Sequence, residues 1–510
     1  MLYKIEISIF VLVRTRKSIR NVSVMLLTQF ITLALAFVSR TVFIKALGAE
    51  YLGLNGLFLN ILNALSLAEM GIGAAISYAL YKPIAEDNRE QIKSLLAFYR
   101  KCYFAVGAFV VTVGCLLIPF LPYLIKGEVT VPVNLSHVYL CFLANSAIGY
   151  FFMHKRTIID DTQNKYITNS VDFIGKVIIS IVQIFILVKF QNYMSFLYAQ
   201  IAGTLLISAT IYFIANKKFP YIKDSCEPLP QAERKKIWSN ISILFLHKFG
   251  GVAILGTDFL IISAFVGISE VGIYSNYTLI ITTVSTFVSA FIIGSKASIG
   301  NAIATLGKDE LYNVFKKLSF LIFCISGFSS VCLLNLLNPF IDLWIGEAYI
   351  LPYSVIAAIT MNFFFTQSRW LVLTFKQDAG IFRPDMYKPL IEVAFNLSLS
   401  IFLVHYYGIL GVVIATLANT FFICIGIEAY IIHKHLFKRS VWIYAKSYLI
   451  QISALLVAFA TSFYINGFMY NFVLKCLVSI SISIVVYFLF FFKTEEFKYF
   501  VGIIKKNRSL

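Results

Sequence analysis

The sequence predicts an all-α integral membrane protein with about fourteen transmembrane helices. Three observations lead to this prediction. The chain is 59% hydrophobic and 13% charged, whereas soluble domains are about 45–50% apolar and about 25% charged. Apolar runs of membrane-spanning length recur along the chain, and Lys and Arg collect in every second connection between them. The chain also matches itself weakly at an offset of 219–220 residues.

Fourteen apolar runs approach or exceed the roughly 20 residues that a helix needs to cross the hydrocarbon core. The first is not followed by a small-residue cleavage site, so we expect it to be a span and not a removed signal peptide. In chain order the runs cover residues 21–46, 51–81, 94–122, 135–153, 166–188, 192–215, 239–266, 271–300, 314–345, 350–375, 386–406, 408–432, 441–465 and 470–492.

The basic residues test the number of spans independently. With the N-terminus placed in the cytoplasm, 34 of the 43 Lys and Arg residues fall in the tails and inner connections, and 4 fall in outer connections. Cytoplasmic enrichment of Lys and Arg is the expected pattern for a correctly oriented chain. We therefore predict that both termini are cytoplasmic, with basic tails at 1–20 and 494–510. The net charge of +18 then reflects orientation and not a nucleic-acid partner.

The internal matches indicate two lobes of six helices. An offset of six helices preserves orientation, which makes this a parallel repeat. It predicts an N-lobe at 21–216, a cytoplasmic linker at 217–238, a C-lobe at 239–437, and helices 13 and 14 at 438–493 without a counterpart. Two such lobes suggest alternating access, with a substrate site between them. The matched pairs include Gly48 and Gly267, Gly53 and Gly272, Pro119 and Pro339, Pro132 and Pro352, and Asp172 and Glu392.

Five cations lie within the predicted spans, where a charge is costly and usually faces a cavity or a partner. Arg40, Lys176, Lys248 and Arg369 are the candidate substrate-binding residues of a cationic cavity suited to an anionic group such as a phosphate. For Arg40, snorkelling to the outer headgroups is the alternative. Lys296 lies near the inner end of its span, where we expect a headgroup contact.

Four acids, Glu69, Asp172, Asp258 and Glu392, are candidates for ion coupling or gating, because burial can raise the proton affinity of a carboxylate. Asp172 and Lys176 are four residues apart on one helix and can instead neutralise each other. Asp258 aligns beside Arg40 in the repeat, which suggests a gate-like pair across the outer cleft.

Other signals are weak. Gly251 and Gly256 have the spacing of a P-loop, but the required Lys is absent. No HExxH motif or other metal-ligand pattern occurs, so we expect no enzyme activity, no metal and no cofactor other than a proton or sodium gradient. Glu428 lies near the cytoplasmic end of its span and is expected to be hydrated, and His433 is expected on a basic surface.

Six segments carry a resemblance to a known family. They are IRNVSVMLLTQF (19–30), SRTVFIKALGAEYLGLNGLF (39–58), LAEMGIGAAISYALYKP (67–83), HKRTIIDD (154–161), GTDFLIISAFVGISEVGIYSNY (256–277) and KASIGNAIAT (296–305). In these segments the chain resembles the polysaccharide transporter family, the repeat-unit flippases of bacterial capsule, O-antigen and exopolysaccharide synthesis. The family shares a superfamily with MATE-type drug exporters and lipid II flippases, and the resemblance implies a MATE-like fold.

The resemblance also implies a transported substrate and a cellular location. Such proteins move an undecaprenyl-diphosphate-linked oligosaccharide from the inner to the outer leaflet of the bacterial cytoplasmic membrane by alternating access. The implied partners are membrane lipid and the polysaccharide polymerase and glycosyltransferases of the same pathway. One alternative is a MATE-like ion-coupled small-molecule exporter, against which the interior cations count. Another is a membrane polymerase or glycosyltransferase, against which the short outer connections count.

Overall fold

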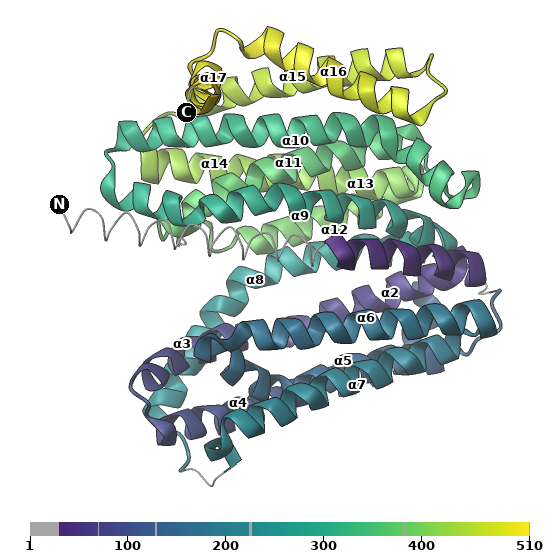
Figure 1. The fold of residues 1–510 in the computed structure, drawn as a ribbon, viewed down its shortest axis with the longest axis vertical. Helices are drawn as coiled ribbons and strands as arrows, with labels where there is room; N and C mark the ends of the chain where they lie inside the picture. Colours follow the sequence, from purple (N-terminus) through teal and green to yellow (C-terminus); the bar gives the residue numbers. More distant parts are fainter. Residues whose placement is uncertain (1–29, 70, 128–129, 224–226, 382, 509–510) are drawn as a thin grey trace. The chain divides into compact units, whose positions relative to one another are not determined.

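The structure is a computed structural model and is described for residues 30–69, 71–127, 130–223, 227–381 and 383–508 (Figure 1). Within these ranges the chain forms helices joined by short connections, with no β-strand. The predicted basic tail at 1–20 and the start of the first predicted span lie outside the described residues.

The described helices follow the fourteen predicted runs in order. Eleven of them are long and apolar enough to cross a membrane, so the protein is an all-α, multi-pass membrane protein, as predicted. The first half contains the helix Phe30–Leu47, α2 (Ala49–Leu65), α3 (Ile72–Ala85), α4 (Arg89–Leu117), α5 (Leu135–Ile159), α6 (Lys165–Phe190) and α7 (Tyr193–Lys218). The second half contains α8 (Gln231–Phe265), α9 (Ile268–Thr305), α10 (Lys308–Ile345), α11 (Tyr353–Asp378), α12 (Lys388–Tyr407), α13 (Ile409–Ala418), α14 (Gly426–Ile432), α15 (Val441–Asn466), α16 (Phe472–Phe491) and α17 (Glu495–Arg508).

Two of the predicted runs are interrupted helices. The 3-10 turn Ser66–Glu69 and Gly71 separate α2 from α3, and Gly71 has a φ of 91°, a value that glycine adopts without steric strain. The π-helical segment η7 (Asn419–Ile425) separates α13 from α14. Hydropathy does not reveal either interruption, because both segments remain apolar enough to continue a span.

The chain divides into two compact units. Unit 1 comprises Ala68–Pro119, Val131–Ser242 and the described part of Met1–Tyr51. In unit 1, α7 packs against both α5 and α6, and α4 packs against α5 (Figure 1). Gly175 on α6 and Gly203 on α7 face isoleucines of the opposite helix. Small residues of this kind let membrane helices approach closely, where apolar burial gives no driving force.

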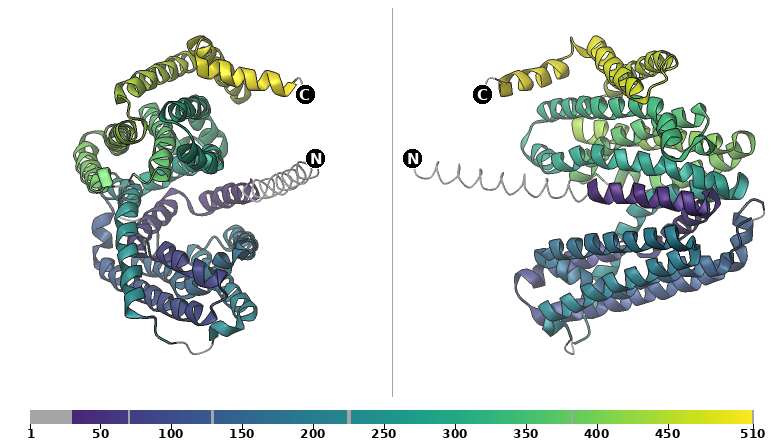
Figure 2. Two further views of the ribbon diagram at one scale, coloured as in Figure 1. Left: turned by 90° about the vertical axis from the view of Figure 1, so that its left-hand side faces the viewer. Right: turned by 45° about the vertical axis from the view of Figure 1, so that its right-hand side comes forward.

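Unit 2 comprises Leu52–Leu67, Phe120–Thr130 and Ile243–Leu510. Its α10 packs against α9, α11, α15 and α16 (Figures 1 and 2). Helices α15 and α16 are joined to α10 by a hydrogen bond and by close packing. Asn335 of α10 donates a hydrogen bond to the hydroxyl of Ser462 at 2.8 Å. The Tyr487 hydroxyl lies over Gly327, 2.5 Å from where a Cβ atom would be.

We expect Gly53→Ala to destabilise unit 2. A Cβ atom at Gly53 would lie 1.9 Å from the backbone carbonyl oxygen of Ile268, at the start of α9. Overpacking typically costs about 1–3 kcal/mol, whereas the better helix propensity of alanine returns about 1 kcal/mol. The clash should dominate because a backbone oxygen cannot rotate aside. The melting temperature of the protein in detergent measures the effect.

Gly149→Ala on α5 is the matched control, since nothing lies within 4 Å of the added methyl group. This variant should melt at or slightly above the parent temperature. Equal melting temperatures for the two variants would contradict the close approach at Gly53.

Candidate functional site

A cluster of four charged side chains, three of them buried and the fourth, Arg369, 25% exposed, joins three helices of unit 2. Arg369 lies on α11, Lys388 and Glu392 on α12, and Glu428 on α14. Arg369 binds Glu428 through two nitrogens, with both distances 3.1 Å, and reaches Glu392 at 3.2 Å. Lys388 pairs with Glu392 at 2.8 Å and also with Glu428. We call these residues the charge cluster.

The charge cluster is electrically balanced, with two cations and two carboxylates. The side chains of Glu428 and Glu392 are 0% and 3% exposed, and that of Lys388 is 5% exposed. Each buried charge therefore depends on its partners, since removing one partner of such a pair typically costs about 3–5 kcal/mol. A neighbouring buried pair, Lys376 with Asp385, is likewise neutral. The arrangement can hold α11, α12 and α14 together.

The expectation that Glu428 is hydrated is wrong. Its nearness to the end of a span does not expose it, because Arg369 and Lys388 replace water as its partners. The π-helical segment η7 contributes to this geometry. A π-helical turn holds one extra residue, and one residue corresponds to about 100° of rotation around a helix. Side chains after η7 therefore point in a direction that uninterrupted periodicity does not predict.

The expectation that His433 lies on the surface is also wrong. His433 is 0% exposed. Its ring lies among aromatic rings, with centroid distances of 5.8 Å to Tyr312, 5.8 Å to Phe315 and 5.2 Å to Tyr444. Its Nδ1 is hydrogen-bonded to the carbonyl of Ala429 at 2.7 Å. The adjacent Lys434 is exposed, so the expected basic surface includes Lys434 but not His433.

Polar residues follow α12 at a spacing of four. Lys388, Glu392, Asn396 and Ser400 are all buried, which places them on one face of the helix. The spacing of four is visible in the sequence, but only Glu392 of these four residues is among the predicted site residues. We call this face the α12 polar stripe.

The α12 polar stripe leads from the charge cluster to Asp258 on α8. Asn396 donates a hydrogen bond to the hydroxyl of Thr416 at 3.1 Å. Thr416, on α13, donates in turn to the two oxygens of Asp258 at 3.0 and 3.1 Å. Asp258 is 8% exposed and forms no ion pair within the described part of the chain. A buried carboxylate that accepts hydrogen bonds from a neutral hydroxyl group is suited to take up a proton or a small monovalent cation.

Unit 1 contains a second polar cluster, formed mainly by tyrosines. Tyr99 and Tyr103 on α4 have ring centroids 4.6 Å apart, and Tyr150 on α5 lies 6.1 Å from Tyr103. The Thr157 hydroxyl bonds to that of Tyr99 at 3.3 Å. The carboxylate of Glu69 interacts electrostatically with all three tyrosine hydroxyls. The predicted acid Glu69 therefore has polar surroundings that hydropathy did not indicate.

Asp172 pairs with a residue other than the one expected. Its partner is Arg156 on α5, with one nitrogen–oxygen distance of 3.2 Å and a second, shorter contact. Lys176 lies one turn further along α6, is exposed, and forms no ion pair within the described residues. An ion pair between α5 and α6 leaves the charge of Lys176 available for another partner.

The structure describes the side chains of two of the three remaining predicted cations. Arg40 is half-buried in the helix Phe30–Leu47, and Lys296 is exposed, with Asp378 at 3.9 Å. The side chain of Lys248, on α8, lies outside the described part of the structure. Within the described residues, no group of three or more His, Cys, Asp or Glu side chains could hold a metal ion.

The fold is shared with solved membrane transporters. A structure of the lipid II flippase MurJ in an inward closed conformation matches with a TM-score of 0.67 and 15% identity, covering 91% of this chain and 98% of that one. The chain therefore shares the fold of this flippase.

Two MATE structures extend this likeness. An inward-facing multidrug resistance MATE transporter of the MOP superfamily matches the same fold with a TM-score of 0.62 and 16% identity, covering 78% of this chain and 93% of that one. A Vibrio cholerae MATE transporter matches with a TM-score of 0.53 and 13% identity, covering 82% and 96%. No protein-family model and no curated protein sequence matches the chain. At these identities the likeness establishes the MATE-like fold alone.

Neutralising one carboxylate of the charge cluster should destabilise the protein. Glu428→Gln preserves size but leaves Arg369 and Lys388 with Glu392 as their only carboxylate in the cluster. We expect a loss of about 3–5 kcal/mol in the free energy of unfolding, measured by denaturant titration in detergent. Glu347→Gln, at an exposed turn, is the control and should change it by less than about 0.5 kcal/mol. Equal stability of the two variants would show that the cluster does not hold the helices together.

Proposed function

We propose that the protein is a flippase that moves an undecaprenyl-diphosphate-linked oligosaccharide from the inner to the outer leaflet of the bacterial cytoplasmic membrane, for surface polysaccharide synthesis. The observation that supports this most directly is the likeness to a lipid II flippase along 91% of this chain and 98% of the other. That protein is itself a flippase, and lipid II is the molecule that it flips. The family resemblance of the sequence supports the same cargo class.

The extent of the matches favours a lipid-linked cargo over a small molecule. The difference between 91% and 78% of the 510-residue chain is about 66 residues. The flippase therefore aligns with a larger share of this chain than the multidrug transporter does.

The physical task requires a polar path, since diphosphates and sugars cannot enter hydrocarbon unaided. We propose that Arg40, Lys176 and Lys248 attract the diphosphate or acidic sugars as the two lobes open alternately. Arg369, the fourth predicted cation, is already balanced by Glu392 and Glu428. We therefore assign Arg369 to the stability of the C-lobe. The polymerase and glycosyltransferases of the pathway would be the functional partners.

For ion coupling we propose Asp258 as the principal carboxylate. It is buried, accepts hydrogen bonds from the Thr416 hydroxyl, and forms no ion pair within the described residues. Of the other predicted acids, Asp172 is paired with Arg156 and Glu392 with two cations. Glu69, beside the tyrosines of unit 1, is the second candidate. The coupling ion would be a proton or sodium.

Substitution of Lys176 should slow translocation without unfolding the protein. We expect Lys176→Gln to lower the rate of flipping of undecaprenyl-diphosphate-linked oligosaccharide in proteoliposomes by about tenfold, the effect of about 1.4 kcal/mol. Lys101→Gln, an exposed lysine on α4, is the control and should flip at the parent rate. A parent protein that exports small organic cations but leaves the lipid-linked oligosaccharide in place would identify the MATE-like alternative.

Substitution of Asp258 should separate coupling from translocation. We expect Asp258→Asn to lose the stimulation of flipping by an imposed proton or sodium gradient, while slow exchange without a gradient persists. Asp342→Asn, at an exposed position of α10, should keep the stimulation. A gradient effect of equal size in both variants would exclude Asp258 as the coupling group.

A further inference from the structure

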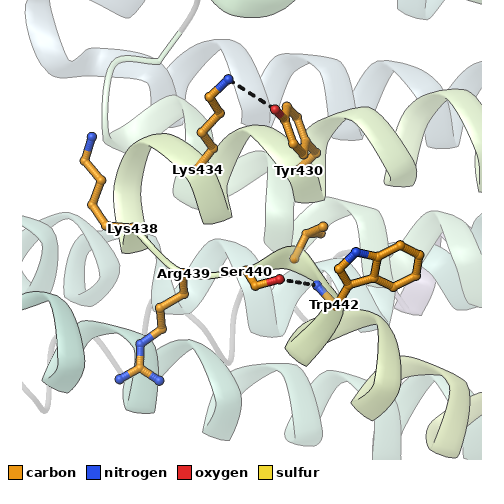
Figure 3. Close-up of a pocket in the computed structure, with 7 residues that line it drawn as sticks. Tyr430, Lys434, Lys438, Arg439, Ser440 and Trp442 are labelled. Carbon is orange, nitrogen blue, oxygen red and sulfur yellow. Dashed lines mark hydrogen bonds between the residues drawn. The ribbon is translucent and has the colours of Figure 1, made fainter.

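Unit 2 also has a pocket at its surface, separate from the charge cluster. It is a hollow of about 460 Å³ where the chain leaves the π-helical segment His433–Phe437 and enters α15 (Figure 3). This end of the helices is the one predicted to face the cytoplasm. We call it the α14–α15 pocket, and it is lined by Tyr430, Lys434, Lys438, Arg439, Ser440, Val441 and Trp442.

The lining of the α14–α15 pocket is cationic. It includes three basic side chains and no carboxylate. Lys434 donates to the Tyr430 hydroxyl at 3.1 Å (Figure 3). Arg439 pairs with Asp309 of α10 at 2.7 Å, but Asp309 is 84% exposed and lies outside the lining. Lys438 forms no hydrogen bond or ion pair through its side chain within the described residues. With Asp309 counted, the group has a surplus of positive charge.

Lys438 occupies a backbone position that favours glycine. Its φ is 56°, in the left-handed region that follows many helix ends, where a residue with a Cβ atom is strained. Backbone strain at a surface residue motivates the hypothesis that its side chain is needed at that position for a function. Here the side chain is one of the cations of the pocket.

An apolar strip leads away from the pocket along α15. Trp442, Leu449 and Leu456 are 78%, 57% and 49% exposed. Their spacing of seven residues places them on one face of the helix. Trp442 and the half-exposed Tyr430 are of the type found at membrane–water interfaces. The cations of the pocket therefore adjoin a surface suited to hydrocarbon.

We propose that the α14–α15 pocket binds the headgroup phosphate of an anionic phospholipid, with an acyl chain along the apolar strip of α15. Lys and Arg side chains bind phosphate by charge-assisted hydrogen bonds, and basic pockets between membrane helices are suited to anionic headgroups. A zwitterionic lipid would bring its own cation into a cationic pocket. Free phosphate would leave the apolar strip unused. This inference does not depend on which cargo the protein transports.

The test compares lipid binding to the delipidated full-length protein and to the double variant Lys434→Gln/Lys438→Gln. The probes are phosphatidylglycerol, phosphatidylcholine, inorganic phosphate and undecaprenyl diphosphate, and binding is counted by native mass spectrometry. The parent should retain phosphatidylglycerol at least fivefold better than phosphatidylcholine. The double variant should lose about 25-fold in phosphatidylglycerol affinity, since each of the two cations near an anionic surface contributes about fivefold.

Lys101→Gln/Lys217→Gln is the matched control, because both lysines are exposed and the net charge falls by the same amount. This control should bind within twofold of the parent, and size-exclusion profiles check that all variants are folded. The proposal is overturned if the control loses as much affinity as the double variant, or if phosphatidylcholine binds equally well. Displacement by millimolar inorganic phosphate would indicate a simple anion site, and tighter binding of undecaprenyl diphosphate would assign the pocket to the cargo. Either result also overturns it.

Discussion

The high free energy of an unpaired charge in a low-dielectric interior is the constraint on which the arrangement of unit 2 depends. Arg369 and Lys388 have Glu392 and Glu428 as partners, and each of these side chains comes from a helix that also supplies apolar packing. The helices α11, α12 and α14 are therefore aligned by electrostatics as well as by contact. Asp258 differs, because its neighbours within the described residues are neutral hydrogen-bonding groups. A carboxylate without a fixed counter-ion can change its charge state more easily than one held in an ion pair.

The helical architecture could be predicted from the sequence because hydropathy and the positions of Lys and Arg are local properties. Each predicted run, the first of them from residue 30 onward, coincides with a described helix or a pair of helices separated by a short turn. The interruption at η7 could not be predicted, because a π-helical turn changes hydrogen bonding without changing hydropathy. The orientation of Glu428 depends on that turn, so its burial could not be predicted either.

Side-chain partners were harder to predict than helices. Asp172 has a lysine one turn away on its own helix, yet it binds Arg156 from α5. Local spacing identifies residues that can meet, whereas the direction in which each helix faces decides which of them do. The α12 polar stripe was within reach of the sequence, since Lys388, Glu392, Asn396 and Ser400 recur at a spacing of four in an apolar segment. Hydrophobic periodicity favours the apolar face, and a narrow polar face is easily overlooked beside it.

The contact between α10 and the last two helices has a consequence for how such chains can change over evolutionary time. Ser330 and Asn335 of α10 are buried, and Asn335 finds a hydrogen-bond partner on α15. Tyr487 of α16 fills the space that the absent side chain of Gly327 leaves. A shortened descendant ending after α14 would present these polar groups and this notch to acyl chains. Loss of the C-terminal pair would thus cost α10 its close packing at Gly327 and one interhelical hydrogen bond, so the pair belongs to the packing of unit 2.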